Sequence, residues 1–582
     1  MVPVARAWLL GAACLAGCGG PAAPPPPVAS RPTPAAVAPA GGWFEDATER
    51  SGLTFQHRNG AAGRYYYPEI LGPGAALLDF DNDGDLDAFL VQGGALGAPA
   101  ATDLWMPDAP PAAGGRLYRN DLDAATSPRW PRFVDVTAAS GLRVDGYGLG
   151  VAAGDIDNDG WTDLYVTRFG TAQLWRNTGR GTFEDISAES GTDNAPGFGV
   201  SAAFVDYDRD GWLDLYVGNN VDYRIEQEKA CPGPSGARDY CPPQIYGGTP
   251  DRLFRNRGHG RFADVTATAL KGGRFGPALG VIATDANLDG WPDIYVANDG
   301  EPNLLWMNQR DGTFLERALP AGAALTAEGR AESSMGVDAA DIDDDGDDDL
   351  VITELTGEGT NVFRNDRGQF SDVSAASGIG PASLRYTGWG TRWVDVDNDG
   401  WLDTLAVNGA IISTRPRQGA EFPYGQRPLL LRNLGTGRFA PAEQAGAPFL
   451  REEAGRGAAF GDVDNDGDID VLVANASGPA RLWLNAVGSS SHWLGLRLVG
   501  TAGRRDMLGA RVGITRADGR TLWRRAHSDG SYASASDPRV LAGLGGEARP
   551  VSVEVHWPDG RRERWSGLSV DRWHTLEQGQ AR

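Results

Sequence analysis

The chain has 582 residues and a formal net charge of -24, with 77 acidic residues against 53 basic ones. This acidity argues against nucleic-acid binding, which requires a basic surface. The 81 glycines, the 18 tryptophans and the regular turn-forming residues favour all-β structure, and the length allows more than one domain.

The first eighteen residues look like a bacterial lipoprotein signal. Arg6 precedes an apolar stretch, residues 7–15, that is too short to cross a membrane, and the tetrapeptide ending at Cys18 has the form of a lipobox. We expect residues 1–17 to be removed and Cys18 to carry two or three acyl chains, which anchor a protein stably. The protein would then be extracytoplasmic and lipid-anchored to the bacterial envelope. Gly19 favours the outer membrane, because it stands where an aspartate often retains lipoproteins at the inner one. The alternative is an ordinary secretory signal in which Cys18 is incidental.

The segment that follows, residues 18–42, consists mostly of proline and alanine. Such a composition cannot build a packed core and favours an extended backbone. We therefore expect a disordered, semi-extended tether that lifts the folded part off the membrane.

One acidic loop recurs seven times in the rest of the chain. The copies read DFDNDGDLD from Asp79, DIDNDGWTD from Asp155, DYDRDGWLD from Asp206, DANLDGWPD from Asp285, DIDDDGDDD from Asp341, DVDNDGWLD from Asp395 and DVDNDGDID from Asp462. Each copy has the form D-x-D-x-D-G-x-x-D or departs from it at one place. At positions 1, 3, 5 and 9, only Asn287 is not an aspartate.

This pattern predicts about seven Ca²⁺ sites. A hard divalent cation takes six to eight oxygen ligands at about 2.3 to 2.6 Å, and acids at positions 1, 3 and 5 of a tight loop supply several of them. The glycine at position 6 allows the sharp turn, position 7 offers its backbone carbonyl, and the acid at position 9 completes the set. The predicted ligands are Asp79, Asp81, Asp83, Asp85, Asp87, Asp155, Asp157, Asp159, Trp161, Asp163, Asp206, Asp208, Asp210, Trp212, Asp214, Asp285, Asn287, Asp289, Trp291, Asp293, Asp341, Asp343, Asp345, Asp347, Asp349, Asp395, Asp397, Asp399, Trp401, Asp403, Asp462, Asp464, Asp466, Asp468 and Asp470.

Simple surface turns are the alternative interpretation of Asp-Gly clusters. A turn alone does not require acid at four fixed places in seven copies. Without a cation, the loops would also hold like charges a few ångströms apart, which is unfavourable at modest dielectric. Seven bound Ca²⁺ ions would bring the net charge from -24 to about -10, an ordinary value for a soluble protein.

The loops differ from EF-hands, because nothing supplies a glutamate at position 12 or two flanking amphipathic helices. Short hydrophobic runs follow the loops instead, as at residues 164–166, 215–217, 294–296 and 471–473. We read these runs as β-strands.

Two further marks recur once per unit and indicate a repeat architecture. The first is L-x-R-N or a near variant, and the second is a phenylalanine that opens a strand. The first ends at Asn120, Asn177, Asn256, Asn308, Asn365, Asn433 and Asn485, and the second lies at Phe44, Phe133, Phe183, Phe262, Phe314, Phe370 and Phe439.

The order of these marks sets the phase of the repeats. A short Gly-rich turn separates Trp175 from Phe183, so the flanking strands should pair as an antiparallel hairpin. Residues 147–153 would then be the first strand of the next unit. The same phase leaves the last unit without an outer strand after Asn485, while a phenylalanine strand at residues 43–46 has no unit of its own. We expect this N-terminal strand to close the ring and give a seven-bladed β-propeller, which leaves no exposed sheet edge.

A Pro/Gly-rich insertion, residues 221–250, separates the third loop from the fourth. Of the four cysteines, Cys14 leaves with the signal and Cys18 is acylated, so Cys231 and Cys241 remain. They predict a local disulfide in an oxidising compartment. Two cysteines without a nearby histidine would make a poor zinc site.

The C-terminal part contains alternating strands broken by the hairpin signals Asp518-Gly519 and Asp559-Gly560, and we expect a small β-sandwich. From Ser489 onward there are 15 arginines against 10 acidic residues. These arginines could grip an anionic ligand or the acidic propeller, or they could form a solvated face. They include Arg504, Arg505, Arg524, Arg525, Arg561, Arg562 and Arg564.

The sequence contains no recognisable catalytic constellation. The six histidines are scattered and show no paired ligand spacing, and no G-x-S-x-G elbow or phosphate-binding glycine loop is present. The tripeptide His527-Ser528-Asp529 cannot form a triad by itself, because neighbours on a strand point to opposite faces. We read it as a turn.

The acidic loops and their adjoining strands resemble FG-GAP/VCBS repeats, the calcium-loop repeats of integrin α-subunit propellers. The segments HWLGLRLVG, LGARVGI, GSYASASDPR and VEVHWPDGR, which begin at residues 492, 508, 530 and 553, resemble the ASPIC/UnbV domain. Together they resemble the cartilage acidic protein family in its bacterial form. The resemblance implies a propeller over residues 43–488 and an ASPIC/UnbV-like domain over residues 489–582. Asn287 departs from the repeat pattern, which puts the affinity of the fourth loop in doubt.

We therefore expect a binding or adhesion module whose calcium ions serve its structure. Its partner would be a protein or a surface glycan, and it would meet the membrane through its lipid anchor. One alternative is an extracellular hydrolase or lyase that acts on polysaccharides and uses the calcium-stabilised propeller as a scaffold. The other is a structural subunit of an envelope complex.

Overall fold

The computed structural model describes residues 42–97, 114–122, 129–234, 236–412, 424–501, 503, 505–549 and 551–581. All of them belong to one compact unit, residues 35–582, and a separate unit of residues 1–34 lies outside the described part. The predicted signal peptide, Cys18 and nearly all of the predicted tether are therefore outside the described residues. Within the described part, no helix is both long and apolar enough to cross a membrane.

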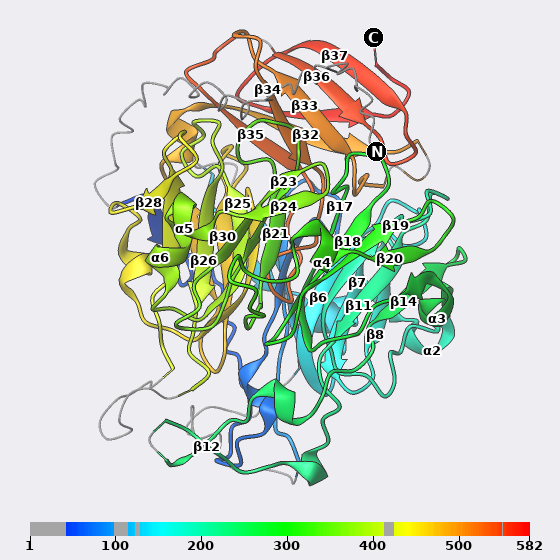
Figure 1. The fold of residues 1–582 in the computed structure, drawn as a ribbon. Helices are drawn as coiled ribbons and strands as arrows, with labels where there is room; N and C mark the ends of the chain where they lie inside the picture. Colours follow the sequence, from blue (N-terminus) through cyan, green and yellow to red (C-terminus); the bar gives the residue numbers. More distant parts are fainter. Residues whose placement is uncertain are drawn as a thin grey trace, which may run out of the picture. The chain divides into compact units, whose positions relative to one another are not determined.

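The chain is mostly β, and most of its strands form four-stranded antiparallel sheets consistent with propeller blades (Figure 1). We number these sheets 1 to 7 by the order of their acidic loops. Sheet 1 holds β2 (Ala75–Leu78), β3 (Asp87–Leu90), β4 (Arg116–Asn120) and β5 (Phe133–Asp135); sheet 2 holds β6 (Tyr147–Gly154), β7 (Asp163–Phe169), β8 (Gln173–Asn177) and β9 (Phe183–Asp185); sheet 3 holds β10 (Gly199–Val205), β11 (Asp214–Asn219), β14 (Arg252–Asn256) and β15 (Phe262–Asp264).

Sheets 4 to 7 repeat this order. Sheet 4 holds β17 (Ala278–Thr284), β18 (Asp293–Asn298), β19 (Leu304–Asn308) and β20 (Phe314–Glu316), with β16 (Leu270–Lys271) added in parallel to β20. Sheet 5 holds β21 (Val337–Ala340), β22 (Asp349–Ile352), β23 (Asn361–Asp366) and β24 (Gln369–Asp372); sheet 6 holds β25 (Gly388–Val394), β26 (Asp403–Asn408), β27 (Leu429–Asn433) and β28 (Phe439–Pro441); sheet 7 holds β29 (Gly455–Gly461), β30 (Asp470–Asn475), β31 (Arg481–Asn485) and β1 (Phe44–Asp46).

The phase predicted from the sequence marks is confirmed. Each acidic loop joins the first strand of a sheet to the second, and the acid at position 9 begins the second strand. The strands β8 and β9 pair as a hairpin in which Asn177 lies opposite Phe183. The N-terminal strand β1 pairs antiparallel with β31, with Phe44 opposite Asn485, so it supplies the fourth strand of sheet 7.

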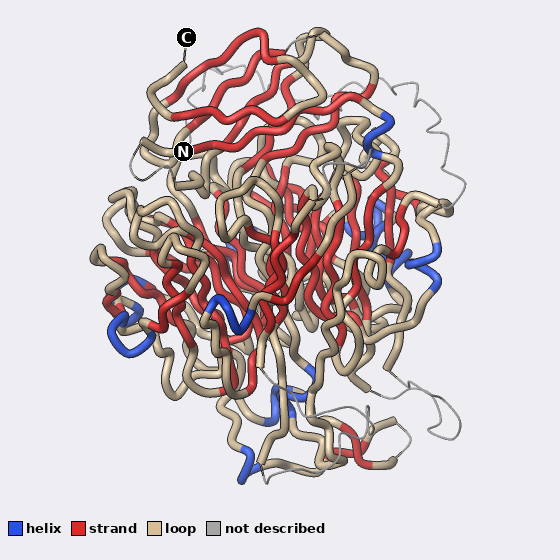
Figure 2. The backbone as a smooth tube through the Cα atoms, turned by 180° about the vertical axis from the view of Figure 1, so that it is seen from behind, coloured by secondary structure: helices blue, strands red, loops and turns tan. Residues whose placement is uncertain are grey.

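Helices are short and few beside the strands (Figure 2). Several follow the fourth strand of a sheet and end at a glycine in the left-handed conformation, such as Gly141 (φ 77°) and Gly191 (φ 78°), where any other residue would be strained. The helices are α1 (Thr137–Ser140), α2 (Ser187–Ser190), α3 (Thr266–Ala269), α4 (Ala318–Ala321), α5 (Ser374–Ser377), α6 (Ile379–Ser383) and the single 3₁₀ turns η1 (Tyr67–Ile70), η2 (Ile225–Gln227), η3 (Pro243–Ile245), η4 (Ala447–Leu450) and η5 (Gly488–Ser490).

Apolar side chains from neighbouring sheets pack against each other. Leu117 of sheet 1 and Leu164 of sheet 2 belong to one buried cluster, and corresponding clusters join each later sheet to the next. Another cluster joins Leu77 of sheet 1 to Leu472 of sheet 7. The first and last sheets are therefore neighbours, although Leu77 and Leu472 are 395 residues apart in sequence.

The insertion between β11 and β14 contains the predicted disulfide. Cys231 and Cys241 are bonded, with their Cα atoms 5.2 Å apart. A two-stranded ribbon, β12 (Cys231–Pro232) and β13 (Arg238–Asp239), lies within the insertion. This prediction from the cysteine count is confirmed.

The C-terminal residues form two further sheets that share one apolar core. Leu494 of one sheet and Val512 of the other belong to this core, as expected for a small β-sandwich. The two predicted hairpins are present, closed by Arg516 N–H to Arg520 O and by Trp557 N–H to Arg561 O. The first sheet holds β32 (His492–Val499), β35 (Val540–Gly545) and β38 (Trp573–Glu577), and the second holds β33 (Arg511–Thr515), β34 (Thr521–Arg525), β36 (Val551–His556) and β37 (Arg562–Leu568).

The connection between β34 and β35, residues 526–539, lies among the first strands of sheets 1 to 7, and we call it the inserted segment. Ala535 bridges Ala76 of sheet 1, and Ser531 bridges Val337 of sheet 5. Tyr532 is fully buried and donates its hydroxyl to Leu71 O at 2.7 Å. This approach depends on glycine, because a Cβ at Gly74 would lie 1.8 Å from Ala533 O. No pattern in the sequence indicated this insertion.

Candidate metal centres

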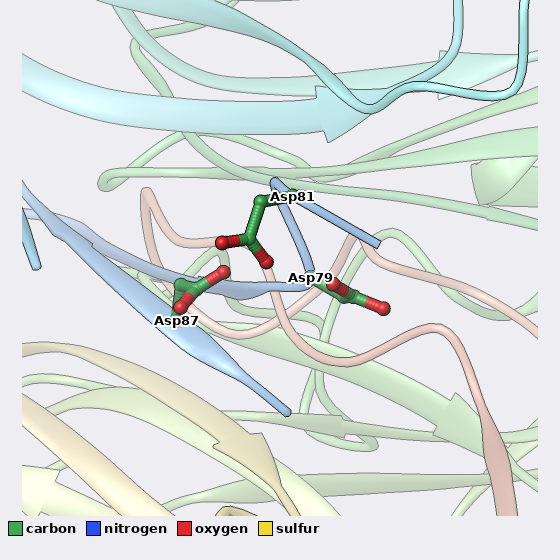
Figure 3. Close-up of side chains that lie close together, drawn as sticks. All are labelled: Asp79, Asp81 and Asp87. Carbon is green, nitrogen blue, oxygen red and sulfur yellow. The ribbon is translucent and has the colours of Figure 1, made fainter. Parts of the chain in front are cut away.

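Aspartates of the repeated loops converge in groups of three. In each group, one potential ligand atom from every side chain lies within 4.8 Å of the others. Asp79, Asp81 and Asp87 form such a group in the first loop (Figure 3). Further groups are Asp155, Asp157 and Asp163; Asp206, Asp208 and Asp210; Asp341, Asp343 and Asp349; Asp395, Asp397 and Asp399; and one more.

Backbone hydrogen bonds shape each loop. In the second loop, the carboxylate of Asp155 accepts the N–H groups of Asp159 at 3.2 Å and Gly160 at 2.8 Å. The carboxylate of Asp159 accepts the N–H of Trp161 at 3.0 Å. Only the backbone of the residue at position 7 takes part in these bonds. Its side chain can therefore be that of aspartate or tryptophan. The role of its carbonyl as a ligand stays a prediction.

The acid at position 9 links three parts of its sheet. Asp163 accepts the N–H of Ile156, at position 2 of the loop, at 2.9 Å and the N–H of Asn177, at the end of β8, at 2.7 Å. The same two bonds occur in all seven loops, which places the asparagine of each L-x-R-N mark beside its acidic loop. The sequence showed these asparagines as repeat marks without indicating this contact.

The asparagine side chains also connect neighbouring sheets. Asn177 Nδ2 donates to Phe80 O, at position 2 of the preceding loop, at 2.8 Å. Asn256, Asn308, Asn365 and Asn485 make the corresponding bond to the loop before theirs at 2.8 Å. Asn120 of sheet 1 donates to Val463 O of sheet 7 at 3.0 Å. The loops of neighbouring sheets are thus tied together on one side of the fold.

The residues fit a divalent cation. Asp81 Oδ1, Asp157 Oδ1 and Asp343 Oδ1 occupy position 3 of their loops and are buried without a hydrogen-bond partner among the described residues. Asp206 Oδ1 and Asp395 Oδ1, at position 1, are in the same situation. A buried carboxylate oxygen without a donor is costly unless a cation stands beside it. A donor set made only of oxygen atoms binds calcium in preference to softer metals.

The electrostatics of the loops agree with this fit. Burial raises the pKa of Asp155 to about 6, and nearby Asp159 and Asp157 add to the effect. Burial likewise raises the pKa of Asp341 to about 8. A bound cation would reverse this penalty, because it favours the ionised carboxylates.

Arginines stand beside some of these acids. Arg255 lies 2.6 Å from Asp208 and 3.1 Å from Asp210, and Arg432 lies 2.6 Å from Asp397. Both arginines belong to L-x-R-N marks. The sequence interpretation assigned no role to the positive charge of these arginines. In the fourth loop, Asn287 Oδ1 accepts the N–H of Asp289 at 3.0 Å, so this amide oxygen is engaged by the backbone.

Arginines of the C-terminal domain reach the same loops. Arg520 pairs with Asp344 at 2.9 Å, Arg525 with Asp348 at 3.4 Å, and Arg497 lies 3.8 Å from Asp79. Arg505 and Arg524 are buried at this interface. The contact with the acidic loops, one of the alternatives left open by the sequence, is therefore correct for these arginines. Arg561 and Arg564 are largely exposed, as a solvated face requires, and Arg504 lies outside the described residues.

The tripeptide His527-Ser528-Asp529 lies near the start of the inserted segment, with a bend at Ser528, and all three side chains are buried. His527 Nδ1 lies 3.2 Å from Asp529 Oδ1, and its Nε2 lies 3.2 Å from Arg392 Nη2. Ser528 instead donates to Ala153 O at 2.8 Å. The serine and the histidine are not paired, so the tripeptide is not a nucleophile with its base.

Two family models match this chain. The ASPIC and UnbV model matches residues 500–582, and the FG-GAP-like repeat model matches residues 155–217, 285–352 and 341–406. The chain therefore carries FG-GAP-like repeats and a C-terminal ASPIC and UnbV domain, which confirms this part of the resemblance.

Curated relatives agree with the family models. Cartilage acidic protein 1 of Xenopus tropicalis is 26% identical over 85% of this chain and 71% of its own length. The protein of the same name from Mus musculus is 26% identical over 88% of this chain and 74% of its own length. Neither name describes an enzyme. Among solved structures, an Agrocybe aegerita lectin that recognises non-reducing terminal N-acetylglucosamine matches with a TM-score of 0.37 at 15% identity, covering 65% of this chain and 90% of the lectin.

Proposed function

We propose that this protein is a calcium-stabilised, lipid-anchored β-propeller that acts as a binding module outside the cytoplasm. The observation that carries the calcium part is the set of buried carboxylate oxygens without partners at equivalent positions of several loops. Each loop would hold one ion through its acids at positions 1, 3, 5 and 9.

We propose further that sheets 1 to 7 are the seven blades of one closed ring. Two independent chains of contacts support closure. The asparagine bonds run from each of several loops to the preceding one and include the bond from Asn120 to Val463 between the first and last sheets. The apolar clusters follow the same order and also join sheet 1 to sheet 7.

In this arrangement the ions would serve stability. Each loop lies between the first and second strands of its sheet and contacts the preceding or following sheet through an asparagine. Cation binding to the native loops would stabilise the folded state, because the unfolded chain offers no such site. The arginines of the C-terminal domain contact the same loops. The packing of this domain against the loops would therefore depend on the charge of the loops.

The binding role is supported by surfaces away from the loops. The disulfide insertion carries Tyr223 and Tyr246, which pack edge to face with ring centroids 5.1 Å apart, and Tyr246 is partly exposed. Partly exposed aromatic side chains on a braced segment suit recognition of a protein or a glycan. The sequence of residues 1–18 supports the lipid anchor, and the disulfide supports an oxidising compartment.

Glycan-array and pull-down screening of the mature protein in calcium tests the binding role. A defined glycan or envelope protein should be retained by the native protein and lost after chelation. Turnover of a tested polysaccharide would show instead that the protein is an enzyme.

A further inference from the structure

Acidic side chains gather at the end of sheets 4 and 5 that lies away from the acidic loops. Glu354 follows β22 and stands about 16 Å of extended chain beyond Asp349, the last acid of loop 5. Glu358 belongs to the turn after Glu354, and Glu332 lies on the connection that precedes β21. We propose that Glu332, Glu354 and Glu358 bind a divalent cation of the calcium type, at a site separate from the seven loops. The site does not require cations in the loops, so it goes beyond the proposed function.

Glu354 occupies a position that carries a hydrogen-bond donor in the other sheets. It is the fifth residue after the position 9 acid of its loop, and the equivalent residue of each other sheet donates a side-chain N–H to a backbone carbonyl. An ionised glutamate cannot make this bond. The donors and acceptors are Gln92 and Gln56 O, Arg168 and Thr171 O, Asn219 and Pro250 O, Asn298 and Pro302 O, Asn408 and Arg427 O, and Asn475 and Pro479 O.

One oxygen of the Glu354 carboxylate has no partner. Its Oε1 accepts the hydroxyl of Ser334 at 3.0 Å and the side-chain N–H of Asn361 at 2.9 Å, whereas its Oε2 has no hydrogen-bond partner among the described residues. Glu354 is 1% exposed, so bulk water does not replace the missing donor. A cation beside Oε2 would offset the cost of burying this oxygen.

The other two acids lie close to Glu354. Asn361 Nδ2 also donates to Glu332 Oε2 at 3.0 Å, which makes the carboxylates of Glu332 and Glu354 neighbours. Glu358 Oε2 accepts the backbone N–H of Ser333, the residue after Glu332, at 2.9 Å. Burial, and then the charges of Glu332 and Glu358, raise the pKa of Glu354 well above its usual range. The three carboxylates therefore oppose each other's ionisation, and one shared cation would relieve this repulsion.

Basic side chains compensate these acids little. Arg330 lies 3.5 Å from Glu332, but its side chain is 67% exposed, and solvent screens such a pair. Asp299, which is buried and forms a β-bridge with Ser333, adds another acid beside the cluster. Carboxylate oxygens bind a hard cation such as Ca²⁺ in preference to softer metals. Glu358 is partly exposed, which gives the cation access from solvent.

The test is anomalous diffraction from crystals of the full chain soaked in Mn²⁺, a hard cation that also takes oxygen ligands. We expect an anomalous peak beside Glu354 Oε2 in the native protein and its loss in Glu354→Gln, while peaks at the acidic loops persist. Glutamine already stands at the equivalent position of sheet 1, as Gln92, so this variant supplies the donor that the other sheets have. Glu301→Gln, at an exposed acid two residues after Asp299, is the matched control and should keep the peak.

Thermal melting gives a second readout. Glu354→Gln should lower the melting temperature in calcium, where it removes a bound ion, and raise it in chelator, where it removes a buried charge. A change of the same sign and size in both buffers would overturn the inference, because Glu354 would then be a protonated carboxyl and not a metal ligand.

The diffraction result separates this inference from the proposed function. Peaks at the loops without one at Glu354 would overturn the inference and leave the calcium role of the loops standing. A peak at Glu354 without peaks at the loops would support the inference and refute the role of the loops, and the absence of any peak would overturn both. If Glu354→Gln fails to fold, Glu358→Gln, at the partly exposed acid of the cluster, should lose the same peak.

Discussion

Replacing Asp157 with alanine tests the metal role of one loop in isolation. Asp157 stands at position 3 of the second loop, and its Oδ1 is buried without a hydrogen-bond partner among the described residues. Removing this oxygen breaks no such bond, and the other hydrogen bond of the side chain is the one from the backbone N–H of Asp159. Its only large effect should be on a cation held in that loop.

The expected size follows from linkage. A site with free calcium at 100 times its Kd contributes about 2.7 kcal/mol to the free energy of unfolding. Loss of one carboxylate ligand that weakens binding tenfold to a hundredfold would remove about 1.3 to 2.3 kcal/mol of this. In chelator the same substitution should be neutral or slightly stabilising. Burial, and then like-charge repulsion from Asp159, raises the pKa of the Asp157 carboxyl, so the ionised side chain is unfavourable in the folded protein.

Thermal unfolding at a fixed excess of calcium and again in chelator measures both quantities. The Glu189→Ala variant, at an exposed helix position between loops 2 and 3, is the control and should match the native protein in both buffers. Equal destabilisation of Asp157→Ala in calcium and in chelator would refute the reasoning, because it would mean that the aspartate stabilises the loop without a metal.

Three further predictions concern other parts of the fold. Asn177→Ala removes the bond from Nδ2 to Phe80 O and leaves a buried carbonyl without that donor. Chemical denaturation should therefore show a free energy of unfolding lower by about 1 to 3 kcal/mol, with or without calcium. An unchanged midpoint would count against the asparagine link. Burial raises the pKa of Asp251 to about 7, so this group stabilises the fold fully below pH 3.8 and loses its contribution, up to about 4 kcal/mol, as pH rises through 7. Asp251→Asn should flatten this part of the stability profile between pH 4 and pH 7, and an unaltered profile would show that the carboxyl is ionised throughout. Cys18→Ser should release the protein from the membrane fraction of the envelope, and continued membrane association would contradict the lipid anchor.

The sequence predicted those features that repeat. Seven copies of the acidic loop, each followed by an apolar run, fixed the second strand of every sheet, and the spacing from Trp175 to Phe183 fixed the hairpin of the third and fourth strands. The same phase identified the strand at Phe44 as the partner of the last sheet. Repetition supplies this information because one local pattern is tested several times along the chain.

Features that occur once could not be predicted in this way. The inserted segment contacts the sheets through single residues such as Tyr532 and Asp529, whose partners lie hundreds of residues away in sequence. Arg525 and Arg520 likewise meet acidic loops that no local pattern connects to them. The burial of the tripeptide His527-Ser528-Asp529 could not be predicted for the same reason, since a short polar sequence of this kind usually lies at the surface.

The most direct test of the calcium claim is elemental analysis of the purified, folded protein, combined with melting in calcium and in chelator. We expect several calcium ions per chain, about one for each loop with a complete acidic set, and a marked fall in the melting temperature when they are removed. A folded protein that holds no divalent cation and melts at the same temperature in both buffers would contradict the account.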